Sequence, residues 1–103
     1  MEIKDIQQFT QDIEPVFTGV LGGTSEEQIM GQLLKVQEEL GEVIQSVLGH
    51  LGKQTNGKNF SDAGLEMADV ILEMFVLADR MNIDLDTKLQ SKIEIIKKRF
   101  ELN

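Results

Sequence analysis

Apolar residues recur every three or four positions along most of the chain, which is the spacing of amphipathic α-helices. The first segment of this kind runs from Ile3 to Ile13. Pro15 is expected to end it, because proline has no N–H group for the helical ladder and its ring restricts the preceding residue. Residues 18–24 are rich in glycine, which predicts a flexible loop after a short first helix.

The clearest helical period begins at residue 25 and continues to about residue 48. Ser25 and Gln28 have the spacing of a capping box, in which two side chains satisfy free backbone N–H groups, so Ser25 is the expected start. The apolar positions that define the period are Ile29, Leu33, Val36, Leu40, Val43 and Val47. The glycines in residues 49–60 then predict a second loop.

A third helix is predicted from the N-cap candidate Ser61 to about Met81. Phe60 is placed to pack on Leu65 as a hydrophobic staple. Most of the circumference of this helix is apolar, so it needs cover on most sides, from its own chain or from a second subunit.

After a short turn at residues 82–84, a fourth helix is predicted from about Leu85. Its apolar face is formed by Leu89, Ile93, Ile96 and Phe100. We therefore expect an all-α fold, with residues 1–103 forming one domain. The expected architecture is a four-helix bundle completed by oligomerisation, as a homodimer or a homotetramer.

Composition narrows the possible functions. The 103 residues are 41% hydrophobic and carry a net charge of −8, which suits one small acidic domain. There is no cysteine, which excludes a disulfide framework, a cysteine zinc site and a thiol nucleophile, and there is a single histidine, His50. No apolar run reaches the length of about 18 residues that a membrane span needs. Without a signal peptide or disulfides, a cytoplasmic protein is expected.

The charge is unevenly distributed. Residues 1–86 carry 16 acidic and 5 basic side chains, whereas residues 87–103 carry 2 acidic and 5 basic ones. An acidic body repels a phosphate backbone, so a nucleic-acid polymer is not an expected partner. The basic end either complements the dipole of the last helix or binds a small phosphorylated ligand.

Two sets of carboxylates lie at helical spacing. Glu38, Glu39 and Glu42 form E-E-x-x-E in the second helix. The third helix carries a further row on one face: Asp62, Glu66, Asp69 and Glu73. Like charges at this spacing destabilise a helix by a few tenths of a kcal/mol per pair. A hard divalent cation, Mg²⁺ or Mn²⁺, would compensate them. The plainer interpretation is a solvated acidic face.

These residues also resemble a known family. KVQEELGEV (35–43) followed by EMAD (66–69) resembles the E-E-x-x-E…E-x-x-D signature of the MazG-like nucleoside triphosphate pyrophosphohydrolases. ADRMNIDLDTKLQSKIEIIKKRF (78–100) is similar to the family stretch in which a short turn leads to K-x-x-x-N-x-x-R. The resemblance implies an all-α enzyme that uses Mg²⁺ to hydrolyse a nucleoside triphosphate to the monophosphate and pyrophosphate.

The resemblance also implies residue roles. The implied metal ligands are Glu39, Glu42, Glu66 and Asp69. Lys92 and Arg99 would meet phosphate oxygens, and Ile96 departs from the family by standing where asparagine is usual. Glu38 is an accessory carboxylate, and either Glu38 or Glu42 would accept the proton of the attacking water. Spacing does not decide between these two.

Two alternatives to this substrate and activity stay open. The related phosphoribosyl-ATP pyrophosphohydrolases act on the same kind of triphosphate, and the motif spacing does not exclude their substrate. A non-catalytic helical dimerisation module is the second alternative, with its acidic stripe binding a structural cation or a basic protein partner.

Overall fold

The computed structural model describes residues 1–53 and 62–103, and within these ranges it contains helices and no strand. The four helices are α1 (Ile3–Leu21), α2 (Ser25–His50), α3 (Ala63–Arg80) and α4 (Leu85–Arg99). The prediction of an all-α fold with four helices is confirmed.

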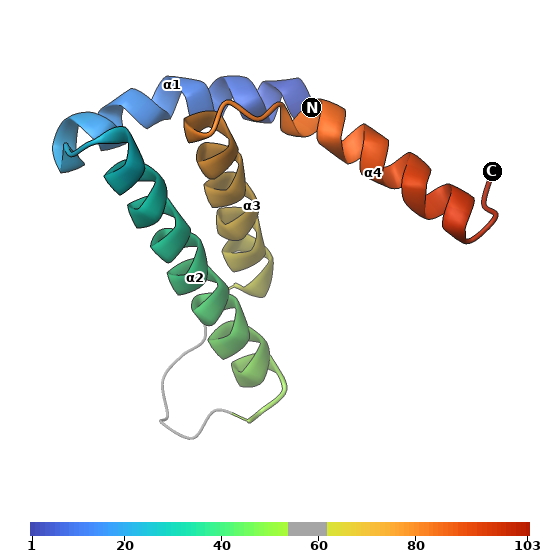
Figure 1. Cartoon of the computed structure of the whole chain (residues 1–103). Coiled ribbons are helices and arrows are strands. Elements are labelled where there is room, and N and C mark those ends of the chain that lie inside the picture. The colour runs from blue at the N-terminus through green and yellow to red at the C-terminus, as the bar shows by residue number, and fades with distance from the viewer. Residues whose placement is uncertain (54–61) are drawn as a thin grey trace.

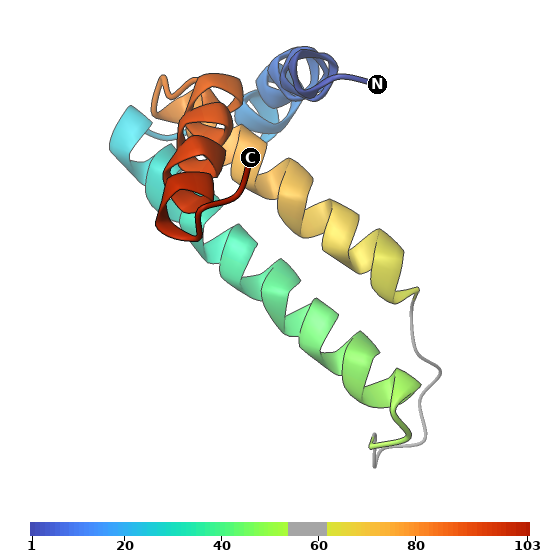
Figure 2. The ribbon, with the colours of Figure 1, turned by 90° about the vertical axis from the view of Figure 1, so that its right-hand side faces the viewer.

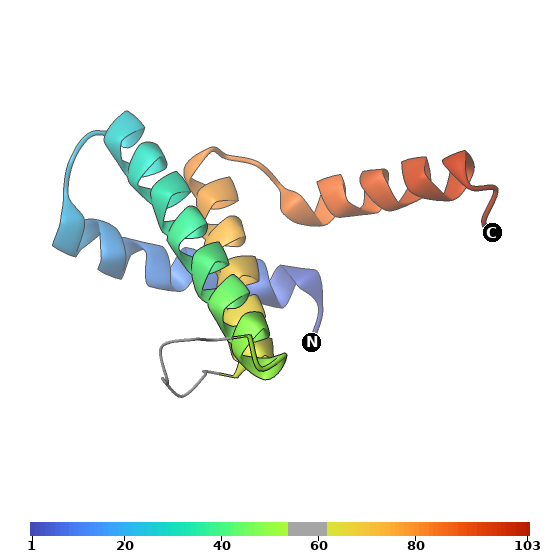
Figure 3. The same cartoon turned by 90° about the horizontal axis from the view of Figure 1, so that it is seen from below.

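The helices form a packed group of three with one helix extending from it. α2 and α3 run antiparallel and side by side, and α1 crosses them at the end where α2 begins and α3 finishes (Figures 1 and 2). α4 leaves that same end and points away from the α2–α3 pair (Figure 3). No residue of α4 is buried. The carboxylate-bearing helices α2 and α3 are therefore the centre of the fold.

The prediction that Pro15 ends the first helix is wrong, because α1 continues through Pro15 to Leu21. The helix therefore tolerates the loss of one backbone hydrogen bond. Before the proline, Thr10 donates to Asp79 and Glu14 pairs with Arg80, which fix α1 to α3. After it, Phe17 lines a cleft shared with α2 and α3. The predicted loop at 18–24 is accordingly shorter than expected.

The predicted start of α2 is displaced by one residue. Thr24, not Ser25, is the N-cap, and its Oγ1 accepts a hydrogen bond from the Glu27 N–H at 3.2 Å. The Glu27 carboxylate in turn accepts from the Thr24 N–H at 3.1 Å, which completes the capping box. Gln28 instead donates to the backbone oxygens of residues 22 and 23.

The starts of α3 and α4 depend on aspartates. Asp62 is the N-cap of α3 and accepts from the Leu65 N–H, so the predicted cap at Ser61 is one residue early. Ser61 and its predicted neighbour Phe60 lie outside the described residues. Asp84 caps α4 and also accepts from Gln7 of α1 at 2.9 Å, which ties the base of α4 to the packed group.

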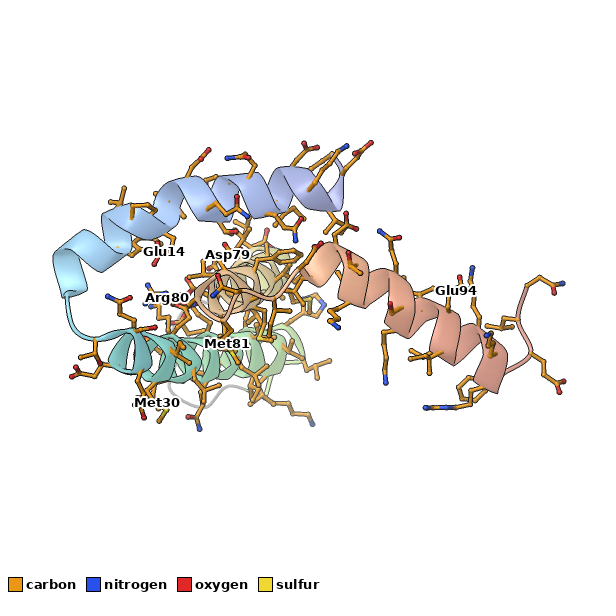
Figure 4. All side chains as sticks on the ribbon, turned by 45° about the horizontal axis from the view of Figure 1, so that its top comes forward. Glu14, Met30, Asp79, Arg80, Met81 and Glu94 are labelled. Carbon is orange, nitrogen blue, oxygen red and sulfur yellow. The ribbon has the colours of Figure 1, made fainter. Side chains whose placement is uncertain are left out.

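A polar joint fixes α1 to the end of α3. Thr10 is completely buried, and its hydroxyl donates to Asp79 Oδ2 at 2.7 Å. Arg80 donates to the backbone oxygen of Gln28 at 3.1 Å, and its Nε lies 3.7 Å from Glu14 Oε1. Figure 4 shows Asp79 and Arg80 between α1 and α2, with Glu14 facing them. One residue pair of α3 thus positions both neighbouring helices.

The N-terminal cap of α2 gives a direct test of this local structure. Thr24→Ala is expected to lower the free energy of unfolding by about 1 kcal/mol, because it removes the acceptor for the Glu27 N–H. For a chain of this length the corresponding fall in Tm is roughly 4–8 °C. Ser25→Ala is the control and should change little. Equal losses in thermal melts of the two variants would show that Ser25 shares the capping role.

Candidate metal centre

α2 faces α3 with a buried row of polar side chains. Gln32, Glu39 and Ser46 are seven residues apart and all buried. Seven residues are close to two helical turns, so the three share one face. The Gln32 amide donates to the Glu73 backbone oxygen at 2.9 Å and to its carboxylate at 2.6 Å, which joins the two helices. Gln32 is not among the residues predicted from the sequence, although its seven-residue spacing from Glu39 places both side chains on one face of a helix.

Three carboxylates from the two helices meet at this interface. Glu39 and Glu42 of α2 and Glu66 of α3 each place one carboxylate oxygen within 4.8 Å of the others. Glu39 is only 7% exposed, and the other two are half-buried. The antiparallel pairing of α2 and α3 therefore brings together three of the four predicted metal ligands.

The cluster has more charge than its surroundings balance. Lys35 Nζ lies 3.1 Å from Glu39 Oε1, and this hydrogen bond raises the pKa of the lysine. Among the described residues, Glu39 Oε2 and Glu66 Oε2 are buried without a hydrogen-bond partner. A buried carboxylate oxygen with no donor costs free energy. The oxygen donors fit a hard divalent cation such as Mg²⁺ or Mn²⁺, which would supply the missing partner.

The protonation of Glu42 reflects the same crowding. The pKa of its carboxyl lies above the ordinary value, mainly because the negative charge of Glu39 disfavours a second charge beside it. Burial and hydrogen bonds with Glu39 and Glu66 raise it further. Such a shift is expected where several carboxylates share one volume.

The remaining predicted site residues lie outside this cluster. Asp69 is exposed, one turn further along α3 than Glu66. Glu38 is exposed and lies 3.6 Å from Lys35 Nζ. Lys92 and Arg99 belong to α4, which points away from the α2–α3 pair, so the chain does not bring them to its own carboxylates (Figure 3).

A cleft of about 540 Å³ lies next to the cluster, between α1, α2 and α3. Its lining includes Phe17, Gln32, Lys35, Glu38, Glu73 and Arg80. Lys35 belongs to both places, because it lines the cleft and binds the Glu39 carboxylate. The volume lies within the range of about 300–1,000 Å³ that is usual for small-ligand sites.

Comparison with known proteins found no matching family model, no matching curated protein and no matching solved structure. In the described part of the chain, no helix is both long and apolar enough to cross a membrane.

Glu42→Gln is expected to have opposite effects with and without Mg²⁺. Without the ion, removing the repelled charge raises Tm at neutral pH. With it, the lost ligand weakens Mg²⁺ binding by at least about tenfold, since even groups that only support a ligand contribute that much. Thermal melts across a Mg²⁺ titration measure both effects. Glu94→Gln, exposed on α4, is the control (Figure 4). A Mg²⁺-induced rise in Tm that survives Glu42→Gln intact contradicts the assignment.

The raised pKa of Glu42 also predicts a pH dependence. The folded protein binds the Glu42 proton at a higher pH than the unfolded chain does, where the pKa of the glutamate carboxyl is 4.5. Lowering the pH from neutral therefore stabilises the metal-free protein through protonation of Glu42. This gain in the free energy of unfolding is complete once the pH falls below the pKa of the unfolded chain. Mg²⁺ binding requires the deprotonated form, so the Mg²⁺-induced rise in Tm should shrink over the same range. The difference in Tm between wild type and Glu42→Gln, followed against pH, isolates this contribution; a difference that is constant with pH would disprove it.

Proposed function

We propose that the chain is a Mg²⁺-dependent hydrolase that cleaves a nucleoside triphosphate to the monophosphate and pyrophosphate. The observation that carries the proposal is a pair of buried oxygens, Glu39 Oε2 and Glu66 Oε2, which have no hydrogen-bond partner within residues 1–53 and 62–103 and lie beside the crowded Glu42. The resemblance of the same residues to the MazG-like signature adds support for phosphate chemistry. Mn²⁺ is the natural substitute for Mg²⁺ with such ligands.

In this proposal Glu39, Glu42 and Glu66 hold the cation. The resemblance implies Asp69 as a further ligand, but this residue is exposed and lies outside the cluster in the single chain. A divalent cation in a carboxylate site neutralises phosphate charge and lowers the pKa of bound water. Phosphoryl transfer depends chiefly on such neutralisation and on positioning. The absence of cysteine from the chain is therefore no obstacle to the activity.

Glu38 is the better candidate for accepting the proton of the attacking water. It lines the cleft and lies outside the group of three carboxylates, so it is not committed to the cation. Lys35 lies close enough to hold the Glu38 carboxylate in place. Glu42, which spacing alone left as an equal candidate, is assigned to the cation.

The cleft supplies room for the nucleoside part of the substrate. Phe17 gives it an aromatic wall on which a base can stack, and Arg80 and Gln32 supply polar groups deeper between the helices. Lys35 stands between the cleft and the carboxylates, where it can meet the first phosphate of the triphosphate. The cleft and the cluster would thus hold two ends of one ligand.

Lys92 and Arg99 of α4 are assigned to phosphate oxygens on the basis of the resemblance. Because α4 does not reach the carboxylates of its own chain, these two residues would meet the substrate at the carboxylates of a second copy. The proposed protein therefore acts as a homo-oligomer. The cytoplasm is the proposed compartment, since nucleoside triphosphates and Mg²⁺ are both abundant there.

The test is pyrophosphate release with Mg²⁺ from a panel of ribo- and deoxyribonucleoside triphosphates and phosphoribosyl-ATP. The wild type should release pyrophosphate from one or a few of them. Glu66→Gln should slow the release by roughly 100-fold or more, which is typical when a charge-stabilising group is lost from an active site. Glu94→Gln should release at the wild-type rate. The proposal fails if the wild type is inactive on the whole panel or if Glu66→Gln stays fully active.

The extensive exposed apolar surface favours a second candidate, a helical dimerisation module in which the cation is structural. The same panel separates the two. A module of this kind gains thermal stability from Mg²⁺ through Glu66 but releases no pyrophosphate from any nucleotide.

A further inference from the structure

The isolated chain exposes far more surface than a compact protein of its mass. Its accessible surface is 7778 Å², whereas about 5,800 Å² is usual for 11.6 kDa. Its radius of gyration is 16.5 Å, against roughly 13 Å for a compact domain of this length. Two chains that each covered the excess of roughly 2,000 Å² would form an interface in the range of obligate dimers.

α4 accounts for part of this excess. Its apolar stripe is exposed along its whole length at Leu89, Ile93, Ile96 and Phe100. The helix has only 15 residues, and an isolated helix of that length is marginal in water. An extended α4 with an uncovered stripe therefore needs a surface to pack on.

The α2–α3 pair offers apolar surface at matching spacing. α2 exposes Met30, Leu33, Leu40, Ile44 and Leu48, which recur at intervals of three, four or seven residues. α3 exposes Met67, Ile71 and Met74, again at intervals of four and three. Both rows have the periodicity of helix surfaces that pack on another helix.

Charge favours pairing between α4 and the α2–α3 pair over pairing between two α4 helices. Residues 87–103 carry a net charge of +3, and residues 1–86 carry −11. On α4, Lys88, Lys92 and Arg99 form a basic row at helical spacing beside the apolar stripe. Two α4 helices in contact would bring like charges together, whereas α4 on the acidic helices brings opposite charges together.

We infer that α4 of each chain packs on the α2–α3 pair of a second copy, in a reciprocal dimer. Its apolar stripe supplies the buried contact, and its basic row faces the partner's acidic helices. The bond between Asp84 and Gln7 fixes the base of α4 to its own chain, so the helix reaches outward to the partner. This inference rests on the homo-oligomer of the proposed function and goes beyond it by naming the surface of the second copy that α4 covers.

Two isoleucines of α4 provide a matched pair of variants. Ile93 lies in the stripe, and Ile95 lies off it, yet both are 50% exposed in the single chain. The wild type should sediment with the mass of two chains or of a multiple of two. Ile93→Asn should raise the dissociation constant by at least about tenfold, because it places an unpaired polar side chain in the interface. Ile95→Asn should change it far less, because Ile95 lies off the stripe and the substitution leaves the charge of the neighbouring basic row unchanged. A monomeric wild type, or equal effects of the two variants, overturns the inference.

Because the chain has no cysteine, a single probe can map the contact without relying on a destabilised variant. Lys92→Cys labelled with a benzophenone maleimide is mixed with ¹⁵N-labelled wild type and irradiated. Cross-links from the light chain to α2 or α3 of the heavy chain are expected. Cross-links confined to one chain, or to the α4 of the other copy, overturn the inference. Neither experiment measures hydrolysis, which the pyrophosphate assay tests independently. A monomeric wild type would also remove the proposed homo-oligomer, whereas cross-links at another surface of the second copy would leave it standing.

Discussion

The antiparallel packing of α2 on α3 is the constraint on which the rest of the structure depends. Gln32 joins the two helices by donating to both the backbone and the carboxylate of Glu73. That pairing places the buried Glu39 carboxylate beside Glu66, where each keeps an oxygen without a partner among the described residues. Packed apolar side chains at such positions often stabilise a fold as well as buried charged groups do, or better. Fold stability therefore does not explain the two carboxylates, and we interpret them as ligands of a cation.

The end of the α2–α3 pair at which α2 begins and α3 finishes positions the other two helices. Asp79 and Arg80 fix α1 across it, which forms the cleft beside the carboxylates. α4 starts there too but leaves the chain's own site, carrying Lys92 with it (Figure 1). The proposed packing of α4 on a second copy would account for three features: the large exposed surface, the basic last helix and the acidic body.

Local pattern predicted much of this structure, and tertiary contacts account for what it missed. The apolar period of residues 25–48 identified α2, because helical spacing is a local property. The cap was placed at Ser25 instead of Thr24, because a cap depends on backbone angles that composition does not fix. α1 continued through Pro15, and the contacts that fix it to α3, from Thr10 to Asp79 and from Glu14 to Arg80, lie before the proline. Four carboxylates were expected to meet between α2 and α3, and three of them, Glu39, Glu42 and Glu66, do so. The rotation of α3 that leaves Asp69 exposed is set by packing, which a single sequence does not reveal.

We propose that Glu39, Glu42 and Glu66 bind one divalent cation between α2 and α3. Mn²⁺ is a suitable probe of this site, because its unpaired electrons broaden the backbone amide signals of residues close to the ion. At Mn²⁺ concentrations well below that of the protein, we expect selective broadening centred on residues 39, 42 and 66, reversed by excess Mg²⁺. Broadening spread evenly over the acidic surface, including the acids of α1 and α4, would contradict it.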